Sequence, residues 1–259
     1  MSTATTSPTA NPTASPTAAV VTTEARLFGR ELGSLFWILL FPTILLVIIG
    51  LVPDFTEPDE GLGGQRFVDI YASVVVVLAM IMAAIMAMPA VIAGYRESGV
   101  LRRMRTTPMH PAAILGAQVG LHAAAVLASL VLALGTARVV HDVRLPASPG
   151  WYAVSVLLAT AAAFAIGAVI TSVSSSSRVV QTVGTIVFFP MMFTSGVWVP
   201  VQTMPGWLHT VVVSTPLGAA SEALNDALHG TTPDLADLAV MGGWAAVLSL
   251  VAVRLFRWE

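Results

Sequence analysis

The sequence reads Tyr95-Arg96-Glu97-Ser98-Gly99-Val100-Leu101-Arg102-Arg103-Met104-Arg105-Thr106-Thr107-Pro108 between two long apolar runs, at residues 70–94 and 111–137. Of the 259 residues, 56% are hydrophobic and only 10% are charged, and the mean hydropathy is +0.84. Soluble domains carry about 25% charged residues, so this composition indicates an integral membrane protein. The polar segment is then the connection between two membrane spans on one face of the bilayer.

The spacing within this segment predicts a short amphipathic helix. Val100, Leu101 and Met104 fall on one helical face. The opposite face carries Arg102, Arg103 and Arg105. Pro108 disfavours a helical conformation for the residue before it and so ends the helix. A helix of this kind, lying flat on a membrane with a basic outer face, is expected to be a docking surface.

The stretch from Arg96 to Pro108 resembles the R-E-x-G-x-L-x-R-x-x-x-[AT]-P segment of ABC exporter permeases of the type-2 family. That family includes drug-resistance, polysaccharide and lipid exporters, and the bacterial antibiotic-resistance permeases of the daunorubicin type are the most similar. In the family this segment is the cytoplasmic coupling helix, which receives force from the ATPase subunit. The alternative is that the arginines only satisfy the positive-inside rule.

The resemblance implies a coupling helix over residues 96–108 and roles for its members. The residues implied in ATPase coupling are Glu97, Gly99, Leu101, Arg102, Arg103, Arg105 and Pro108. The charged members would meet the ATPase, Leu101 would pack against the membrane domain, and Gly99 would permit close approach. The resemblance further implies two permease copies, as a homodimer or with a similar subunit, together with two ATPase chains.

All twelve basic residues are arginine, and the chain contains no lysine. The phosphate-binding loop of ATPases requires Gly-Lys-Ser/Thr, because its lysine reaches the phosphates. The chain therefore needs no cofactor of its own, and ATP and Mg²⁺ are expected on a separate ATP-binding partner.

The net charge of −2 argues against a nucleic-acid partner. Since there is no cysteine, disulfides and thiolate metal sites are excluded.

The hydrophobic pattern predicts an all-α protein with about six transmembrane helices. Residues 1–23 are rich in Ser, Thr, Pro and Ala and are expected to be a disordered cytoplasmic tail. Residues 24–34 are expected to form an interfacial helix, and 35–259 the transmembrane domain. The six predicted spans are 35–52, 70–94, 111–137, 151–173, 179–199 and 235–253. Pro42 and Pro89 lie within two of them, and Pro42 is expected to bend its helix.

Residues 179–221 carry no charge and are interrupted by several prolines and glycines. We interpret 200–233 as a re-entrant or extracellular segment between spans five and six, since irregular backbone at membrane depth must be covered by protein or water. This region also resembles the type-2 permeases, through Phe193-Thr194-Ser195-Gly196, Pro200, Met204-Pro205-Gly206-Trp207-Leu208 and Thr215-Pro216. Thr215 replaces the asparagine that is usual there.

The arginines predict the orientation. Six spans with a cytoplasmic N-terminus place nine arginines inside and only Arg66, Arg138 and Arg144 outside, and orientation follows this bias. Seven spans would give seven inside and five outside. Six spans are therefore favoured, with both termini in the cytoplasm of a bacterial cell and the chain in its plasma membrane.

No acidic or basic residue lies in the middle of a predicted span, which argues against proton-coupled transport. Gln118 and His122 are the most polar residues at depth, on one helical face. The favoured interpretation is an interhelical hydrogen bond, and the alternative is a contact to substrate along the transport path. Met191 and Met192 would suit an adaptable apolar surface along a substrate path, or simple packing.

The sequence is compatible with two alternative functions. A polysaccharide or lipid-linked glycan exporter of the same family would have a similar sequence, although an uncharged path favours a lipophilic drug, antibiotic or lipid-like cargo. An intramembrane serine hydrolase would use Ser195 and His209. It is disfavoured because Phe193 stands where that motif requires glycine, and because no carboxylate partner for His209 is evident in the sequence.

Overall fold

The structure is a computed structural model, and it describes residues 16–101, 112–174 and 176–256. Within these ranges nearly all regular structure is helical, which confirms the all-α fold class. The first half contains α1 (Pro16–Phe28), α2 (Leu32–Leu35), η1 (Phe36–Leu40), α3 (Phe41–Ile49), η2 (Pro53–Phe55), β1 (Pro58–Asp59), η3 (Glu60–Leu62), β2 (Gln65–Arg66), α4 (Phe67–Ile81), η4 (Met82–Ala87) and α5 (Met88–Glu97). The second contains α7 (Ala112–His141), α8 (Pro149–Val173), α9 (Ser177–Thr194), η5 (Val201–Thr203), α10 (Gly206–Val213), α11 (Pro216–His229) and α12 (Leu235–Leu255).

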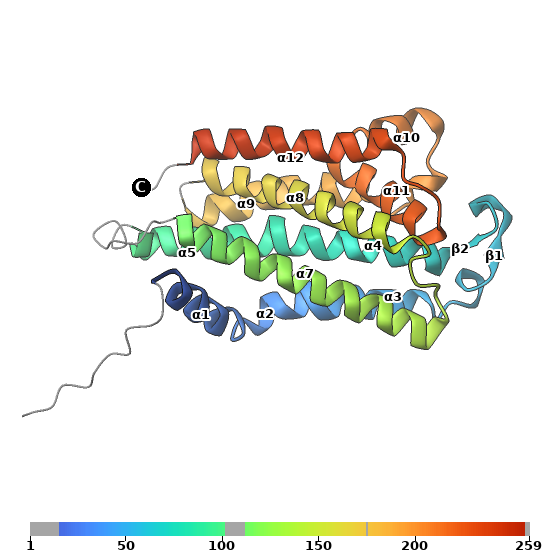
Figure 1. The fold of residues 1–259 in the computed structure, drawn as a ribbon, viewed down its shortest axis with the longest axis horizontal. Coiled ribbons are helices and arrows are strands. Elements are labelled where there is room, and N and C mark those ends of the chain that lie inside the picture. The colour runs from blue at the N-terminus through green and yellow to red at the C-terminus, as the bar shows by residue number, and fades with distance from the viewer. Residues whose placement is uncertain (1–15, 102–111, 175, 257–259) are drawn as a thin grey trace, which may run out of the picture.

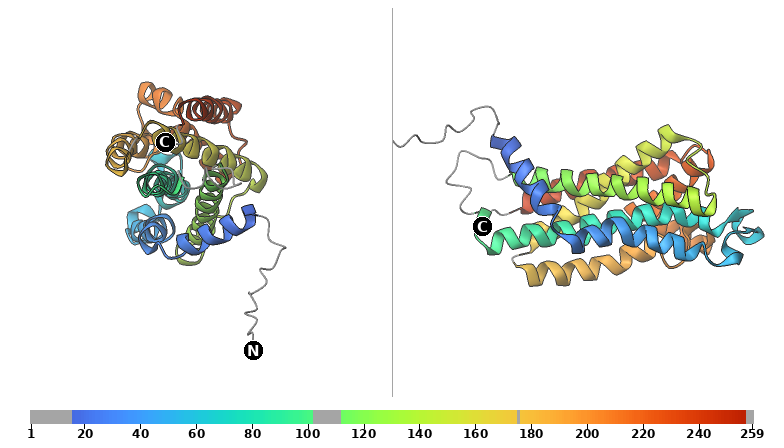
Figure 2. Two further views of the ribbon diagram at one scale, coloured as in Figure 1. Left: turned by 90° about the vertical axis from the view of Figure 1, so that its left-hand side faces the viewer. Right: turned by 90° about the horizontal axis from the view of Figure 1, so that it is seen from below.

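Five helical stretches in the described ranges are long and apolar enough to cross a membrane. They are Leu32–Ile49, Phe67–Glu97, Ile114–His141, Pro149–Val173 and Leu235–Leu255. They agree with five of the predicted spans to within a few residues. Helix α9, at the predicted fifth span, is 18 residues long and runs beside the others, but it is not among the five (Figure 2). The chain is therefore a multi-pass membrane protein, and the count of six spans stays a prediction.

The helices form a bundle whose two ends differ (Figure 1). We call the end where α1, the last turn of α5 and the C-terminus lie the α1 end. We call the other end, where β1, β2 and α10 lie, the hairpin end. Helix α4 is buried from Val68 to Ile81 because α3, α7, α8 and α11 pack around it. A helix that is apolar on every side is stable only when covered in this way or by lipid.

Two of the spanning helices contain a π-helical segment directly before a proline. Segment η1 (Phe36–Leu40) precedes Pro42, and segment η4 (Met82–Ala87) precedes Pro89. Proline lacks an N–H and its ring clashes with the carbonyl group four residues earlier, so the α-helical hydrogen-bond pattern cannot continue through it. The wider π-helical turn accommodates this loss without breaking the helix. The bend expected at Pro42 thus takes the form of a π-helical segment.

The predicted boundaries at the N-terminus are wrong. Helix α1 begins at Pro16 and ends at Phe28, whereas residues up to 23 were expected to be disordered and 24–34 to form one helix. A turn separates α1 from α2, which starts the first long apolar stretch at Leu32. Composition misled the prediction because α1 is stabilised by packing against α7, which the local sequence does not reveal. Residues 1–15 lie outside the described ranges.

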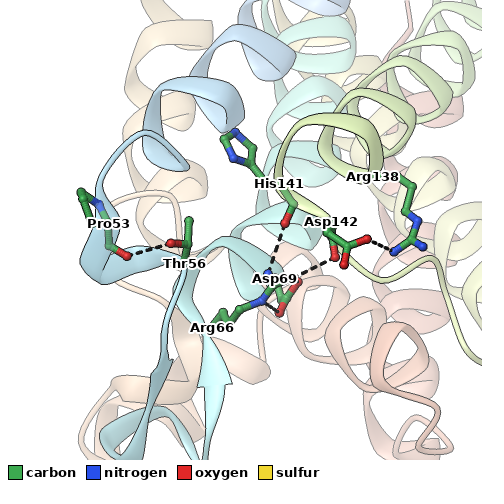
Figure 3. A network of polar contacts seen from close by, with 7 residues as sticks. All are labelled: Pro53, Thr56, Arg66, Asp69, Arg138, His141 and Asp142. Atoms are coloured by element: carbon green, nitrogen blue, oxygen red, sulfur yellow. Dashed lines mark hydrogen bonds and ion pairs between the residues drawn. The ribbon is translucent and has the colours of Figure 1, made fainter.

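Arg66 links the start of α4 to the end of α7 through hydrogen bonds at the hairpin end (Figure 3). Its guanidinium group donates two hydrogen bonds of 2.7 Å to the two carboxylate oxygens of Asp69. It also donates to the backbone carbonyls of His141 and Asp142, at 3.2 and 3.1 Å. The hydrogen bond to Asp69 raises the pKa of Arg66, so the side chain stays charged. Asp142 adopts a positive φ of 53°, and the bond to its carbonyl group holds this turn.

The chain between α9 and α12 begins and ends at the hairpin end (Figure 1). Within it α11 is largely buried against α8 and α12. Thr215 caps α11, because its hydroxyl group accepts a hydrogen bond from the N–H of Gly218. Threonine therefore performs a capping role that asparagine also performs well. This course is compatible with the re-entrant segment expected over 200–233, which stays a prediction because the structure contains no membrane.

Gly167 of α8 lies directly against the backbone of η4. A Cβ atom added at Gly167 would lie 1.9 Å from the carbonyl oxygen of Ala84. No side chain therefore fits between the two helices, and their separation is set by backbone contact. Small residues at helix crossings allow this close approach in membrane proteins.

We expect Gly167→Ala to lower the stability of the purified protein by about 1–3 kcal/mol, because α8 must move away from η4. The measurement is the thermal unfolding midpoint in detergent. Gly135→Ala is the matched control, since the space around Gly135 in α7 is open. An unchanged midpoint for Gly167→Ala would show that α8 and η4 are not in backbone contact.

Candidate functional site

The last turn of α5 binds the end of α8. The guanidinium group of Arg96 donates hydrogen bonds to the backbone carbonyls of Thr171, at 3.2 Å, and of Ser174. These are among the last carbonyl groups of α8, which have no partner within their own helix. The same guanidinium group lies 5.6 Å from the ring centre of Phe256, just after α12. Arg96 therefore joins the ends of α5, α8 and α12.

The neighbouring residue binds the start of α9. One carboxylate oxygen of Glu97 accepts a hydrogen bond from the N–H of Ser177, at 2.8 Å, and the other from its hydroxyl group, at 2.7 Å. The N–H groups of a first helical turn lack helical partners and carry partial positive charge, so a carboxylate suits them. We call Arg96 and Glu97 together the α8–α9 clamp. Its cation lies on the negative end of α8 and its anion on the positive end of α9.

This geometry changes the expectation for the segment at 96–108. Residues 96 and 97 belong to α5, which ends there, and Gly99 follows with a φ of +69°. That left-handed conformation favours glycine, and it separates α5 from a new helical turn at Val100 and Leu101. The predicted helix therefore starts after Gly99 rather than at residue 96. Glu97, expected to face the ATPase, is bound to Ser177 of its own chain.

Leu101 is 2% exposed, which agrees with its expected packing against the membrane domain. The remaining coupling residues lie outside the described ranges: Arg102, Arg103, Arg105 and Pro108.

Gln118 connects α7 to α1 and α5. Its amide group donates a 2.7 Å hydrogen bond to the Glu24 carboxylate, which is only 7% exposed. The same carboxylate oxygen accepts a 2.6 Å bond from the hydroxyl group of Tyr95. His122 is buried, with its ring at 4.8 Å from that of Phe28. Gln118 thus makes an interhelical hydrogen bond, and both polar residues of α7 lie against α1.

Met191 and Met192 lie on α9, away from Gln118 and His122. Both pack against the main hydrophobic core. Met191 also lines an apolar cavity of about 290 Å³ between α8, α9 and α12. The four residues suggested for a substrate path are therefore not brought together in one site.

A larger cavity of about 670 Å³ lies between the first span, η4–α5 and α9, and we call it the π-groove. One wall is formed by Trp37 and Ile38 of η1, and the second by Met82 and Met86 of η4. Phe188 of α9 closes the third side, two residues before Pro190 within that helix. Figure 2 shows α3, α5 and α9 along one side of the bundle when it is seen from the α1 end.

Both π-helical segments of the described chain face this same groove. π-helical turns are rare and occur often at functional sites, because they alter the direction of side chains. The prolines that accompany them were visible in the sequence, but their meeting at one groove was not. Glu31, at the α1 end of the groove, was also not singled out from the sequence.

The serine hydrolase alternative has no support. The hydroxyl group of Ser195 is buried and donates to the carbonyl group of Met192, at 3.0 Å. Contrary to the expectation, His209 has a carboxylate partner. Its Nε2 atom lies 2.6 Å from a carboxylate oxygen of Glu222, and its partner is therefore not Ser195. Because serine and histidine have different partners, they do not form a nucleophile–base pair.

The spanning helices and the apolar grooves between them are those of a multi-pass membrane protein. Residues 17–228 match the family model described as "ABC-2 type transporter". The chain therefore belongs to the ABC-2 type transporter family, as one of its membrane-spanning permease subunits.

Two relatives of the chain are named as drug-resistance permeases. The chain is 27% identical over 238 residues to a probable doxorubicin resistance ABC transporter permease protein of Mycobacterium tuberculosis, covering 90% of this chain and 82% of the relative. It is 34% identical over 88 residues to a daunorubicin resistance ABC transporter permease protein of Streptomyces coeruleorubidus. That second match covers 33% of this chain and 31% of the relative, so the matched part is about a third of the Streptomyces protein.

We expect Glu97→Ala to release the first turn of α9, because both hydrogen bonds to Ser177 are lost. Hydrogen exchange measured by mass spectrometry should become several-fold faster at the first amides of α9, and stay unchanged in the middle of α8. Glu57→Ala, an exposed carboxylate at the hairpin end, is the control. Equal exchange in Glu97→Ala and the parent chain would mean that Glu97 does not hold α9.

Proposed function

We propose that this chain is the membrane-spanning subunit of an exporter that moves a lipophilic drug, antibiotic or lipid-like substrate out of the cell. A separate ATP-binding subunit, which holds ATP and Mg²⁺, supplies the energy. The π-groove carries the proposal, because it is a large and mainly apolar cavity between spanning helices. The names of the two relatives, both resistance permeases for drugs, support it.

The α1 end faces the cytosol in this proposal. Arg66, Arg138 and Arg144 line one cavity beside β2 and the end of α7, at the hairpin end. The other described arginines belong to α1 and the turn after it, the last turn of α5, the start of α9 and the end of α12, which lie toward the α1 end (Figure 1). Cytoplasmic ends of membrane proteins carry the excess of arginine. The bacterial plasma membrane and the two cytoplasmic termini follow from the same bias and from the bacterial relatives.

The ATP-binding subunit would dock on the connection between α5 and α7. Arg102, Arg103 and Arg105 supply its basic face, and Leu101 anchors it to the bundle. A displacement of this connection moves the end of α5, and the α8–α9 clamp passes that movement to both helices. Because α9 closes one side of the π-groove, a movement at the docking site of the ATP-binding subunit would change the shape of the substrate site.

A second permease copy, identical or similar, would face the open side of the π-groove. Trp37 is 48% exposed there, and further large apolar side chains of the first span and α9 are exposed nearby, among them Phe36, Leu40, Ile186 and Phe189. Transport is then alternating exposure of a path between two subunits.

A polysaccharide or lipid-linked glycan is the less favoured substrate. Sugar hydroxyl groups require many hydrogen-bonding partners, and burying them without partners is costly. The side chains that line the π-groove are apolar except for Glu31 and Ser34. This lining fits a lipophilic molecule better.

We expect Arg103→Glu to abolish export without loss of membrane insertion, because a reversed charge faces the ATP-binding subunit. The assay is drug efflux from cells that express both subunits, with the permease quantified in isolated membranes. Arg144→Glu makes the same charge change at the exposed hairpin end and serves as control.

The partner itself is testable by genetics and purification. A neighbouring gene should encode a chain with Gly-Lys-Ser/Thr, and that chain should co-purify with this one. Normal efflux by Arg103→Glu would contradict docking through this face. Failure of any such ATPase to associate would contradict the function as a whole.

A further inference from the structure

The lining of the π-groove contains one charged side chain, the carboxylate of Glu31. We propose that the groove binds lipophilic cations, with Glu31 as the counter-ion and the apolar walls around the rest of the molecule. This inference rests on the proposed export function and specifies the chemical class of its substrate.

The Glu31 carboxylate is available to a ligand. Within the described ranges its side-chain partner is the hydroxyl group of Ser34, which donates a long hydrogen bond of 3.4 Å. Its neighbour Arg30 is exposed, and no described arginine forms an ion pair with Glu31. A cation bound in the groove would supply the charged partner that this half-buried carboxylate lacks among the described residues.

The walls suit the same ligand. Trp37 and Phe188 present aromatic rings to the cavity, and an aromatic face attracts a cation through its quadrupole. Met82 and Met86 add polarisable and flexible side chains that adapt to ligands of different shapes. An anionic lipid would instead meet the Glu31 carboxylate and be repelled, so charge complementarity selects cations.

The backbone supports a binding site independently of this charge. Both π-helical segments, η1 and η4, face the groove, although they come from different helices. Each replaces part of a regular α-helix at the position where its side chains enter the cavity. Such irregular turns occur frequently at functional sites.

The test is equilibrium binding to the purified full chain in lipid nanodiscs. Three probes of similar size differ in charge: tetraphenylphosphonium is a cation, triphenylphosphine oxide is neutral, and tetraphenylborate is an anion. The parent chain should bind the cation most tightly. Glu31→Gln should weaken binding of the cation by about tenfold, with little effect on the neutral probe.

Two variants control for charge and folding. Glu31→Asp keeps the carboxylate and should keep the preference for the cation. Glu57→Gln makes the same charge change in an exposed loop at the hairpin end and should bind like the parent chain. Equal binding of all three probes by the parent chain would overturn the proposal, and so would an equal loss of all three in Glu31→Gln.

A second copy of the chain could instead fill the groove. Because the chain has no cysteine, Ala90→Cys places a single thiol in the groove wall. Cross-linking of two copies through this thiol, together with absent cation binding, would assign the groove to the dimer interface and reject the ligand site.

Export measurements separate this proposal from the function on which it rests. If efflux of both cation and neutral probe is insensitive to Glu31→Gln, the site is wrong and the exporter stands. If no probe is exported with any ATP-binding subunit while binding depends on Glu31, the site stands and the exporter is wrong.

Discussion

Two adjacent side chains of opposite charge hold the α1 end of the bundle together. Arg96 binds carbonyl groups at the end of α8, and Glu97 binds the N–H and the hydroxyl group of Ser177 at the start of α9. Each charge is opposite in sign to the helix end that it meets, so both contacts are favourable. They add directed hydrogen bonds to the packing of α5 against α8 and α9. The position of α9, and with it one side of the π-groove, depends on this clamp.

A second polar link lies at the same end of the bundle as the clamp. The buried carboxylate of Glu24 binds both Tyr95 of α5 and Gln118 of α7. These two helices flank the arginine-rich connection on either side. Helix α1 is therefore joined to both α5 and α7 by hydrogen bonds.

The sequence predicted most of the fold and little of the groove. Spans appear in the sequence as uncharged apolar runs, and membrane helices must satisfy their backbone internally, so pattern alone locates them. The start of α1 was missed because its stability comes from α7. The bond between Glu97 and Ser177 was not foreseen because the two residues are eighty positions apart in the chain. Pro42 and Pro89 were visible, but which faces their π-helical turns present depends on how the two helices pack.

The backbone contact at Gly167 gives the π-groove two walls of different stiffness. Segment η4 rests on α8 with no side chain between them, so rotamer changes cannot widen that contact. On the other side, α9 meets the groove through the ring of Phe188, which can turn. The η4 wall is therefore the more constrained of the two, and the Phe188 side is where rotation of a side chain can change the shape of the groove.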